Sequence, residues 1–309
     1  MEKKINNVYI SGLGAVGCVY ASLIHDTKSA SLSVIADSDR IKRYSDNGIT
    51  INGGKYSFNY VAPDNRGNGP ADLILIAVKQ HNLAESIDAI KNFVGNDTII
   101  LSLLNGITSE DIIGEVYGRE KILHSFVVAT DAVREGTVVK FSNSGRIVFG
   151  SEKGSKENSK VEAVKELFDR SGISYVVPDD ITREQWWKFM MNVGINQVSA
   201  ILRAPYGVFH DTVEAQELLR MASMEVLAIA EKKGIQLTDN DIKEHLEVFR
   251  KLSPAGKTSM FQDVEAGRKT EVEIFSGAVI DLGKQYGIPT PVNDILFRMI
   301  RTIEQMNSM

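Results

Sequence analysis

The sequence has 309 residues, which is enough for two domains that each bury a hydrophobic core. Its formal net charge is −5 and its Lys and Arg residues are scattered, so we expect no nucleic-acid partner, which would need a basic stripe. No segment approaches the roughly 18–20 consecutive apolar residues of a membrane span, so we expect no membrane partner either.

Short apolar runs alternate with amphipathic segments in the first part of the chain. The runs predict strands at residues 7–11, 32–36, 72–78 and 98–104. Continuous apolar runs of this kind suit strands that are buried on both faces of a parallel sheet. The helical patterns between them therefore predict a βαβ layout.

Antiparallel strands are expected next, at residues 122–130, 136–142 and 145–151. The turn signals "REG" and "NSG" lie between them, which adds hairpins to the parallel strands and predicts a mixed sheet. A helix is expected at about 161–170, ended by a glycine, before one more strand stops at Pro178.

The last part of the chain has helical patterns almost throughout. Helices are expected at residues 182–203, about 212–233, about 239–250 and 271–287, and one more follows "GIPTP". Strands followed by helices place a domain boundary near residue 179. The predicted fold is therefore an α/β domain at residues 1–178 and an all-helical domain at 179–309.

A glycine-rich segment, "VYISGLGAVG", ends the first expected strand and begins a helical pattern. Gly12 allows a tight turn, Gly14 lets a pyrophosphate approach the backbone, and Gly17 lets helix and strand pack closely. The sequence therefore predicts a Rossmann-type dinucleotide-binding domain. The residues expected to bind the dinucleotide in this segment are Gly12, Leu13, Gly14, Ala15, Val16 and Gly17.

Cys18 is the only cysteine, so the chain has no intrachain disulfide and no thiolate zinc cluster. We expect it to pack against the sheet rather than to act as a thiolate, because no His or second Cys accompanies it. The histidines show no ligand spacing, and we expect no metal site. A single cysteine fits a reducing compartment, and we expect a cytoplasmic protein.

Two expected strands end in polar residues. Lys79 follows the strand at 72–78, and Asn105 follows the strand at 98–104. In open α/β sheets ligands bind beyond the carboxyl ends of the strands, so both side chains should point at the cofactor crevice. The alternatives are a solvated lysine at the strand end and a turn asparagine before glycine.

The segment "WWKFMMNVGIN" places Lys188, Asn192 and Asn196 four residues apart on an otherwise apolar helix. At 3.6 residues per turn they form one narrow polar stripe. One interpretation is that the stripe binds a polar ligand. The other is that Lys188 extends to solvent from the helix edge and the asparagines bridge to another helix.

The chain resembles the ketopantoate reductase (2-dehydropantoate 2-reductase) family from about Ile5 to Pro291. Five segments carry the resemblance in order: the glycine segment, the "VK" and "NG" strand ends, "WWKFMMNVGIN" and "TSMFQDVEAGRKTEVE". The resemblance implies that Lys188 is catalytic, that Asn105, Asn192, Asn196, Ser259 and Glu271 bind substrate, and that Lys79 and Asn105 contact the cofactor. For Ser259 a helix cap is the alternative. Glu273 is then solvated or paired with Lys269 or Arg268.

The resemblance also implies an activity, the reduction of 2-dehydropantoate to pantoate by hydride transfer from NADPH in pantothenate and coenzyme A biosynthesis. Lys188 would protonate the ketone oxygen, which gains negative charge in the transition state. A related dehydrogenase of another 2-oxo or 3-hydroxy acid is the first alternative, and a dinucleotide-binding sensor without turnover is the second. A 2-oxo acid is thus the expected small-molecule partner, and a homodimer is possible.

The preference for NAD or NADP depends on the residues that follow the second expected strand. Asp37 lies about twenty residues after Gly17, where a carboxylate binds the ribose 2′-hydroxyl of NAD and repels a 2′-phosphate. The family usually prefers NADP, and Arg40 lies close enough to pair with a phosphate, with Lys42 and Arg43 nearby. We expect NADP(H) with Arg40 as the phosphate partner, and NAD(H) remains possible because of Asp37.

Overall fold

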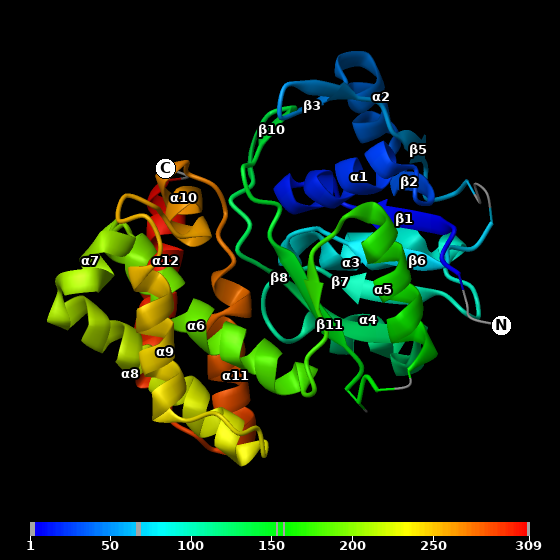
Figure 1. The fold of residues 1–309 in the computed structure, drawn as a ribbon. Coiled ribbons are helices and arrows are strands. Elements are labelled where there is room, and N and C mark those ends of the chain that lie inside the picture. The colour runs from blue at the N-terminus through cyan, green and yellow to red at the C-terminus, as the bar shows by residue number, and fades with distance from the viewer. Residues whose placement is uncertain (1–3, 66–68, 153, 157, 308–309) are drawn as a thin grey trace. The chain divides into compact units, whose positions relative to one another are not determined.

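The computed structural model describes residues 4–65, 69–152, 154–156 and 158–307 (Figure 1). The chain divides into two compact units. Unit 1 comprises Met1–Asn105 and Ser109–Ile181, and unit 2 comprises Gly106–Thr108 and Thr182–Met309. Unit 1 has a Rossmann-type α/β fold and unit 2 is helical, which confirms the predicted fold class.

The main sheet of unit 1 has the strand order β12-β11-β8-β7-β6-β1-β2-β5 in the described residues. The strands are β1 (Asn7–Ser11), β2 (Ser31–Ile35), β5 (Asn59–Val61), β6 (Leu73–Ile76), β7 (Ile99–Ser102), β8 (Ile122–Val128), β11 (Arg146–Gly150) and β12 (Tyr175–Val176). Neighbouring strands from β5 to β8 are parallel, and β11 is antiparallel to β8. The sheet is therefore mixed, as expected.

Helices cover both faces of this sheet (Figure 1). They are α1 (Ala15–Thr27), α2 (Ser38–Asn47), α3 (Leu83–Ile90), α4 (Ser109–Tyr117) and α5 (Ser159–Ser171), with 3₁₀ turns η1 (Gln80–Asn82), η2 (Lys91–Phe93) and η3 (Arg119–Lys121). Val8 and Ile10 of β1 belong to the core with α1 and α5, whereas Tyr9 belongs to the core with α3. Burial on both faces explains why these strands are apolar throughout.

A second, smaller sheet corrects one expectation. The segment expected as a strand at 136–142 of the mixed sheet forms β10 (Val138–Lys140) of a separate sheet, with the order β4-β3-β10-β9. Its partners are β3 (Ile49–Ile51), β4 (Gly54–Tyr56) and β9 (Val133–Glu135). Val139 alone of β10 is buried, in the core beside α1, so the strand buries only one face.

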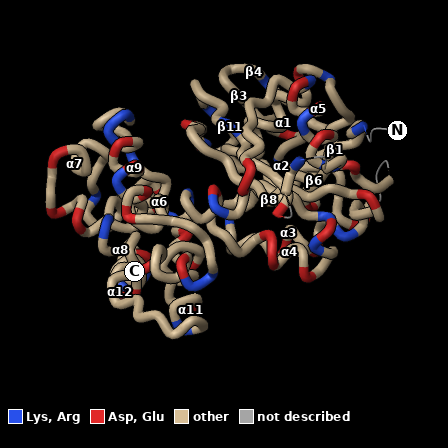
Figure 2. The backbone as a smooth tube through the Cα atoms, turned by 60° about the horizontal axis from the view of Figure 1, so that its bottom comes forward, with Lys and Arg blue, Asp and Glu red and all other residues tan. Residues whose placement is uncertain are grey.

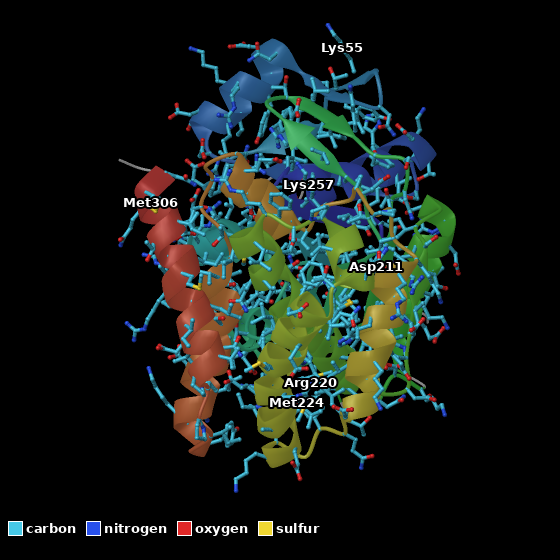
Figure 3. All side chains as sticks on the ribbon, turned by 90° about the vertical axis from the view of Figure 1, so that its left-hand side faces the viewer. Lys55, Asp211, Arg220, Met224, Lys257 and Met306 are labelled. Carbon is cyan, nitrogen blue, oxygen red and sulfur yellow. The ribbon has the colours of Figure 1, made fainter. Side chains whose placement is uncertain are left out.

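Unit 2 consists of helices around one core. They are α6 (Ile181–Leu202, whose first residue belongs to unit 1), α7 (Tyr206–Asp211), α8 (Val213–Lys232), α9 (Asp239–Arg250), α10 (Ser259–Glu265), the 3₁₀ turn η4 (Val272–Ile274), α11 (Ser276–Tyr286) and α12 (Pro291–Asn307). Figure 3 shows Arg220 and Met224 one turn apart on α8. The helix expected at 271–287 begins instead as η4, and α11 starts at Ser276.

Charges of both signs are interspersed along each unit (Figure 2). Many of them form local pairs, such as Arg220 with Glu217 on α8 and Lys257 with Glu265 on α10. Within the described part of the chain, the helices are too short or too polar to span a membrane.

Candidate active site

The glycine loop joins β1 to α1 in unit 1. Gly12 has φ +100°, and a side chain there would lie 2.7 Å from the carbonyl oxygen of Ala77. A side chain at Gly17 would overlap the carbonyl oxygen of Gly12. Both positions therefore require glycine for the fold itself, as the sequence predicts.

Gly14 differs from the other two glycines. It is the N-cap residue of α1, its φ is −66°, and an added Cβ would meet only the Ala77 carbonyl oxygen, at 3.6 Å. Packing within the protein therefore does not demand glycine here. What glycine leaves open at this position is the approach to the backbone N–H groups at the N-terminus of α1, which attract anions.

The strand order reverses at β1. From β1 the chain continues to β2 and β5 on one side and then to β6, β7 and β8 on the other. Ligands of such sheets bind beyond the carboxyl ends of the strands at this switch point. Lys79 follows β6 as the half-buried N-cap residue of η1, and Asn105, also half-buried, follows β7. The predicted cofactor residues thus lie at one edge of the sheet.

Cys18 is fully buried in the core beside this loop, and its Sγ lies 3.5 Å from the carbonyl oxygen of Leu13. Burial raises the pKa of the thiol to about 11, although the guanidinium of Arg134 lowers it. The side chain is therefore a neutral thiol, and the predicted packing role is confirmed.

Asp37 and Arg40 are already paired at the start of α2. Asp37 is the N-cap residue, and its Oδ1 accepts a hydrogen bond of 2.7 Å from the backbone N–H of Arg40. The Arg40 Nε lies 3.3 Å from Asp37 Oδ2, and its Nη1 lies 2.9 Å from Oε1 of Glu85 on α3. Sequence reasoning missed Glu85, because no local pattern connects it to a residue 45 positions away.

A buried polar network lies beneath the end of β7. The hydroxyls of Ser102 and Ser109 are 2.7 Å apart, and Ser109 Oγ donates to Oε2 of Glu110 at 2.8 Å. The backbone N–H of Ser125 on β8 donates to Glu110 Oε1 at 3.4 Å. Burial raises the pKa of Glu110, and the nearby His124 opposes this shift. The network fixes the start of α4 to β7 and β8.

The polar stripe on α6 of unit 2 is buried. Lys188, Asn192 and Asn196 are 8%, 9% and 5% exposed, and apolar core residues of α6 surround them in sequence. A lysine that extended to solvent would be more exposed, so burial argues against that alternative for Lys188. Ligand binding by the stripe stays a prediction. A side chain at Gly194 would lie 2.5 Å from Ser223 Oγ of α8, so α6 packs closely against that helix.

A second polar network holds α6 among its neighbours. Gln197 donates to the Val193 carbonyl at 3.0 Å and to Asn293 Oδ1 at 3.4 Å. Ser276 of α11 hydrogen-bonds to both Gln197 and Asn293, and Asn293 donates to Glu225 of α8 at 2.7 Å. These bonds link α6, α8, α11 and α12 and give the stripe a rigid support.

Ser259 is the exposed first residue of α10. The alternative that it caps the helix is wrong, because Thr258 is the N-cap residue and its hydroxyl accepts from the backbone N–H of Phe261 at 3.2 Å. Substrate binding by Ser259 stays a prediction.

Glu271 is half-buried at the N-cap position of η4. Glu273, two residues later, pairs with Lys269 at 3.7 Å and with Arg301 at 2.9 Å. Arg268 pairs instead with Asp263. The ion pairs of Glu273 agree with a structural role for it.

The predicted residues fall into two groups. Unit 1 holds the glycine loop, Asp37, Arg40, Lys79 and Asn105, and unit 2 holds Lys188, Asn192, Asn196, Ser259 and Glu271. The first group lies at the carboxyl ends of the strands, where such sheets bind dinucleotides, and the second group consists of a lysine, two asparagines, a serine and a glutamate. In the described residues, no cluster of His, Cys, Asp and Glu is arranged to hold a metal ion.

Comparison with known families agrees with this division. The family described as "Ketopantoate reductase PanE/ApbA" matches residues 8–154, and "Ketopantoate reductase PanE/ApbA C terminal" matches residues 180–304. A 2-dehydropantoate 2-reductase of Pyrococcus horikoshii is 26% identical over 300 residues, which cover 97% of this chain and 98% of that protein. A 2-dehydropantoate 2-reductase of Pyrobaculum aerophilum is 28% identical over 302 residues, with 96% and 98% covered.

Solved structures share the fold over nearly the whole chain. A complex of D-mandelate dehydrogenase with NADH and anilino(oxo)acetate has a TM-score of 0.87 at 24% identity and covers 98% of this chain and 99% of that one. A dimeric ketopantoate reductase of Staphylococcus aureus has a TM-score of 0.81 at 21% identity, with 97% and 99% covered.

Proposed function

The chain belongs to the ketopantoate reductase family, and from this we propose that it reduces 2-dehydropantoate to pantoate with a reduced nicotinamide dinucleotide. The product would serve pantothenate and coenzyme A synthesis. The observation that carries the proposal is the buried stripe of Lys188, Asn192 and Asn196, because an ammonium and two amides on one helix suit an oxygen-rich acid.

The glycine loop fits the dinucleotide. Gly14 leaves its backbone open, and the N-terminus of α1 attracts a pyrophosphate. When bound, the nicotinamide supplies the hydride that reduces the ketone carbon. Lys79 and Asn105, at the carboxyl ends of β6 and β7, would orient the cofactor and the substrate next to it.

Lys188 would act as the general acid. The ketone oxygen gains negative charge as the carbon is reduced, and a protonated ammonium both stabilises that charge and delivers a proton from Nζ. Burial strengthens this interaction because water screens it less. The amides of Asn192 and Asn196 would donate hydrogen bonds to the substrate oxygens, Glu271 would accept a hydrogen bond from the substrate hydroxyl, and Ser259 would bind the substrate carboxylate.

A related 2-hydroxy acid dehydrogenase is the second candidate. The likeness to D-mandelate dehydrogenase with NADH favours it. The pairing of Arg40 with Asp37 and Glu85 bears instead on the cofactor, because it engages the guanidinium that a 2′-phosphate would need. The NADP(H) choice stays a prediction, and the contacts support NAD(H).

Steady-state assays test the proposal. The purified protein is assayed with 2-dehydropantoate and with a panel of 2-oxo acids that includes phenylglyoxylate, each with NADH and NADPH. We expect the highest kcat/KM with 2-dehydropantoate. A higher value with phenylglyoxylate would establish the second candidate, and no oxidation of either nicotinamide would refute both.

Because the Staphylococcus aureus relative is dimeric, we propose a homodimer for this chain as well. Light scattering on the eluting protein gives its mass directly, and a monomeric mass would refute this.

A further inference from the structure

The ion pair between Arg40 and Glu85 bridges two helices that flank the glycine loop. Arg40 lies in the first turn of α2, which follows β2, and Glu85 lies in the first turn of α3, which follows β6. In the sheet, β1 lies between β2 and β6. The pair therefore extends past the carboxyl end of β1, where the glycine loop begins.

The two helices belong to opposite faces of the sheet. Tyr44 of α2 packs in the core that contains α1, whereas Leu83 and Ile87 of α3 pack in the core on the other face. The Arg40–Glu85 pair thus passes over the carboxyl ends of the central strands, where sheets of this kind bind dinucleotides. The residue at the end of β2, Asp37, is where such folds recognise the adenosine ribose.

The three side chains form one charged group. Asp37, Arg40 and Glu85 are 44%, 42% and 57% exposed, so a ligand can reach them, and two carboxylates with one guanidinium give a formal charge of −1. A 2′-phosphate carries about −1.5 to −2 charges and needs a free guanidinium. A ribose 2′-hydroxyl needs only a carboxylate that accepts a hydrogen bond from it.

Asp37 and Glu85 contact different nitrogens of the Arg40 guanidinium. Asp37 contacts the Nε of Arg40 and caps α2, while Glu85 takes Nη1. We propose that Glu85 is a specificity-determining residue that selects NADH over NADPH by holding the Arg40 guanidinium and by adding a negative charge beside the ribose. The inference rests on the proposed function, because it requires a nicotinamide dinucleotide at the glycine loop.

Binding measurements on the full chain test this without substrate. Dissociation constants of NADH and NADPH are measured by calorimetry for the wild type and for Glu85→Gln. We expect the wild type to bind NADH more tightly. The substitution should strengthen NADPH binding about fivefold, because an exposed ion pair contributes at most about 1 kcal/mol and its loss frees the guanidinium by that amount. NADH binding should stay nearly unchanged.

Two further variants separate the ion pair from overall charge. Asp88→Asn removes a carboxylate from the same helix that pairs with Lys91 and not with Arg40, and it should leave the NADPH/NADH ratio unchanged. In an Arg40→Ala background, Glu85→Gln should strengthen NADPH binding less than in the wild type, because only the effect of the Glu85 charge remains; an equal gain in both backgrounds would refute the role of the ion pair.

The outcomes separate this inference from the proposed function. If both dinucleotides bind but Glu85→Gln keeps the wild-type ratio, or if Asp88→Asn shifts it equally, the role of Glu85 is refuted and the reductase proposal stands. A wild-type preference for NADPH likewise overturns it. If neither dinucleotide binds, the proposed function fails and this inference fails with it.

Discussion

Lys188 is a buried residue of α6, and its removal should affect the chemical step. We predict that Lys188→Ala lowers kcat by about 10²–10⁴, the usual contribution of a positioned general acid. Dinucleotide binding should stay near wild type, because the glycine loop lies in unit 1. Stopped-flow and steady-state rates measure the effect.

Lys243→Ala is the control for this substitution, because that lysine on α9 is exposed and its ion pair with Asp239 is long, at 3.6 Å. It should keep the wild-type kcat. A wild-type kcat in Lys188→Ala on the true substrate would show that another group donates the proton.

Substitution of Asn196 or Glu271 should lower the efficiency with which the enzyme uses its substrate. We predict that Asn196→Ala or Glu271→Ala lowers kcat/KM by about tenfold to a hundredfold, as expected for lost hydrogen bonds to a small polar acid, with unchanged dinucleotide affinity. Glu273→Ala is the matched control, since its carboxylate is engaged by Arg301 and Lys269. Loss of dinucleotide binding in either test variant would place these residues in the cofactor site instead.

At the scale of single residues, local spacing was the informative signal. The interval of four between Lys188, Asn192 and Asn196 predicts one helix face, and the structure places all three on α6 in buried positions. Glu85 and Glu110 could not be found this way. Their contacts depend on which strands are neighbours in the sheet, and sequence periodicity carries no information about that.

In the strand–loop–helix element at the glycine segment, we expect substitution of Gly17 and of Gly14 to have different effects on folding and on dinucleotide binding. Gly17→Ala should destabilise the fold by several kcal/mol, because the new methyl group would overlap the Gly12 carbonyl oxygen. Gly14→Ala should fold with near wild-type stability, since its Cβ has ordinary contact distances, but bind dinucleotide much more weakly.

Thermal unfolding without ligand and calorimetric titration with NADH and NADPH separate the two effects. Normal dinucleotide binding by Gly14→Ala would mean that the pyrophosphate does not approach this backbone. An unaltered melting temperature for Gly17→Ala would contradict the observed packing.

Elements with a strong period or a long apolar run were predictable, and short ones were not. The strands at 7–11 and 98–104 and the helix at 239–250 agree with β1, β7 and α9. The three-residue strands β3, β4 and β5 were missed, because so few residues establish no alternation. The same holds for the short helices α7 and α10, whose boundaries depend on tertiary packing.

At the scale of the molecule, each unit has its own hydrophobic core. The cores of unit 1 lie on the two faces of the main sheet, and that of unit 2 lies among α6, α8, α9, α11 and α12. Strand patterns followed by helix patterns indicate such a division from sequence, because each kind of element must bury its own apolar face. Buried ionisable groups, in contrast, give each core its own response to pH.

Acid should act in opposite directions on the two units through two such groups. Burial lowers the pKa of His245 in unit 2 to about 4 from its ordinary 6.5, with Asp241 opposing and Arg183 reinforcing the shift. Burial raises the pKa of Glu110 in unit 1. Protonation of His245 therefore favours the unfolded chain, whereas protonation of Glu110 favours the folded chain.

The different proton affinities of His245 in the folded and unfolded chain set how the free energy of unfolding changes with pH. Between pH 6.5 and 4 the unfolded chain binds a proton at this histidine that the folded chain does not. Stability is therefore complete above pH 6.5 and falls as the pH decreases toward 4, by at most about 3 kcal/mol at 1.36 kcal/mol per unit. We predict that unit 2 loses this stability in acid.

His245→Phe tests the prediction, because a phenylalanine can keep the edge-on ring contact with Trp187, whose centroid lies 4.4 Å away, without a proton to bind. Denaturant unfolding of wild type and variant at a series of pH values from 7 to 4 gives the two slopes. The variant should lose about 3 kcal/mol less than the wild type over this range. His81→Asn, at an exposed position, is the control and should follow the wild type. Equal slopes for His245→Phe and wild type would mean that the buried imidazole does not control the acid stability of the helical unit.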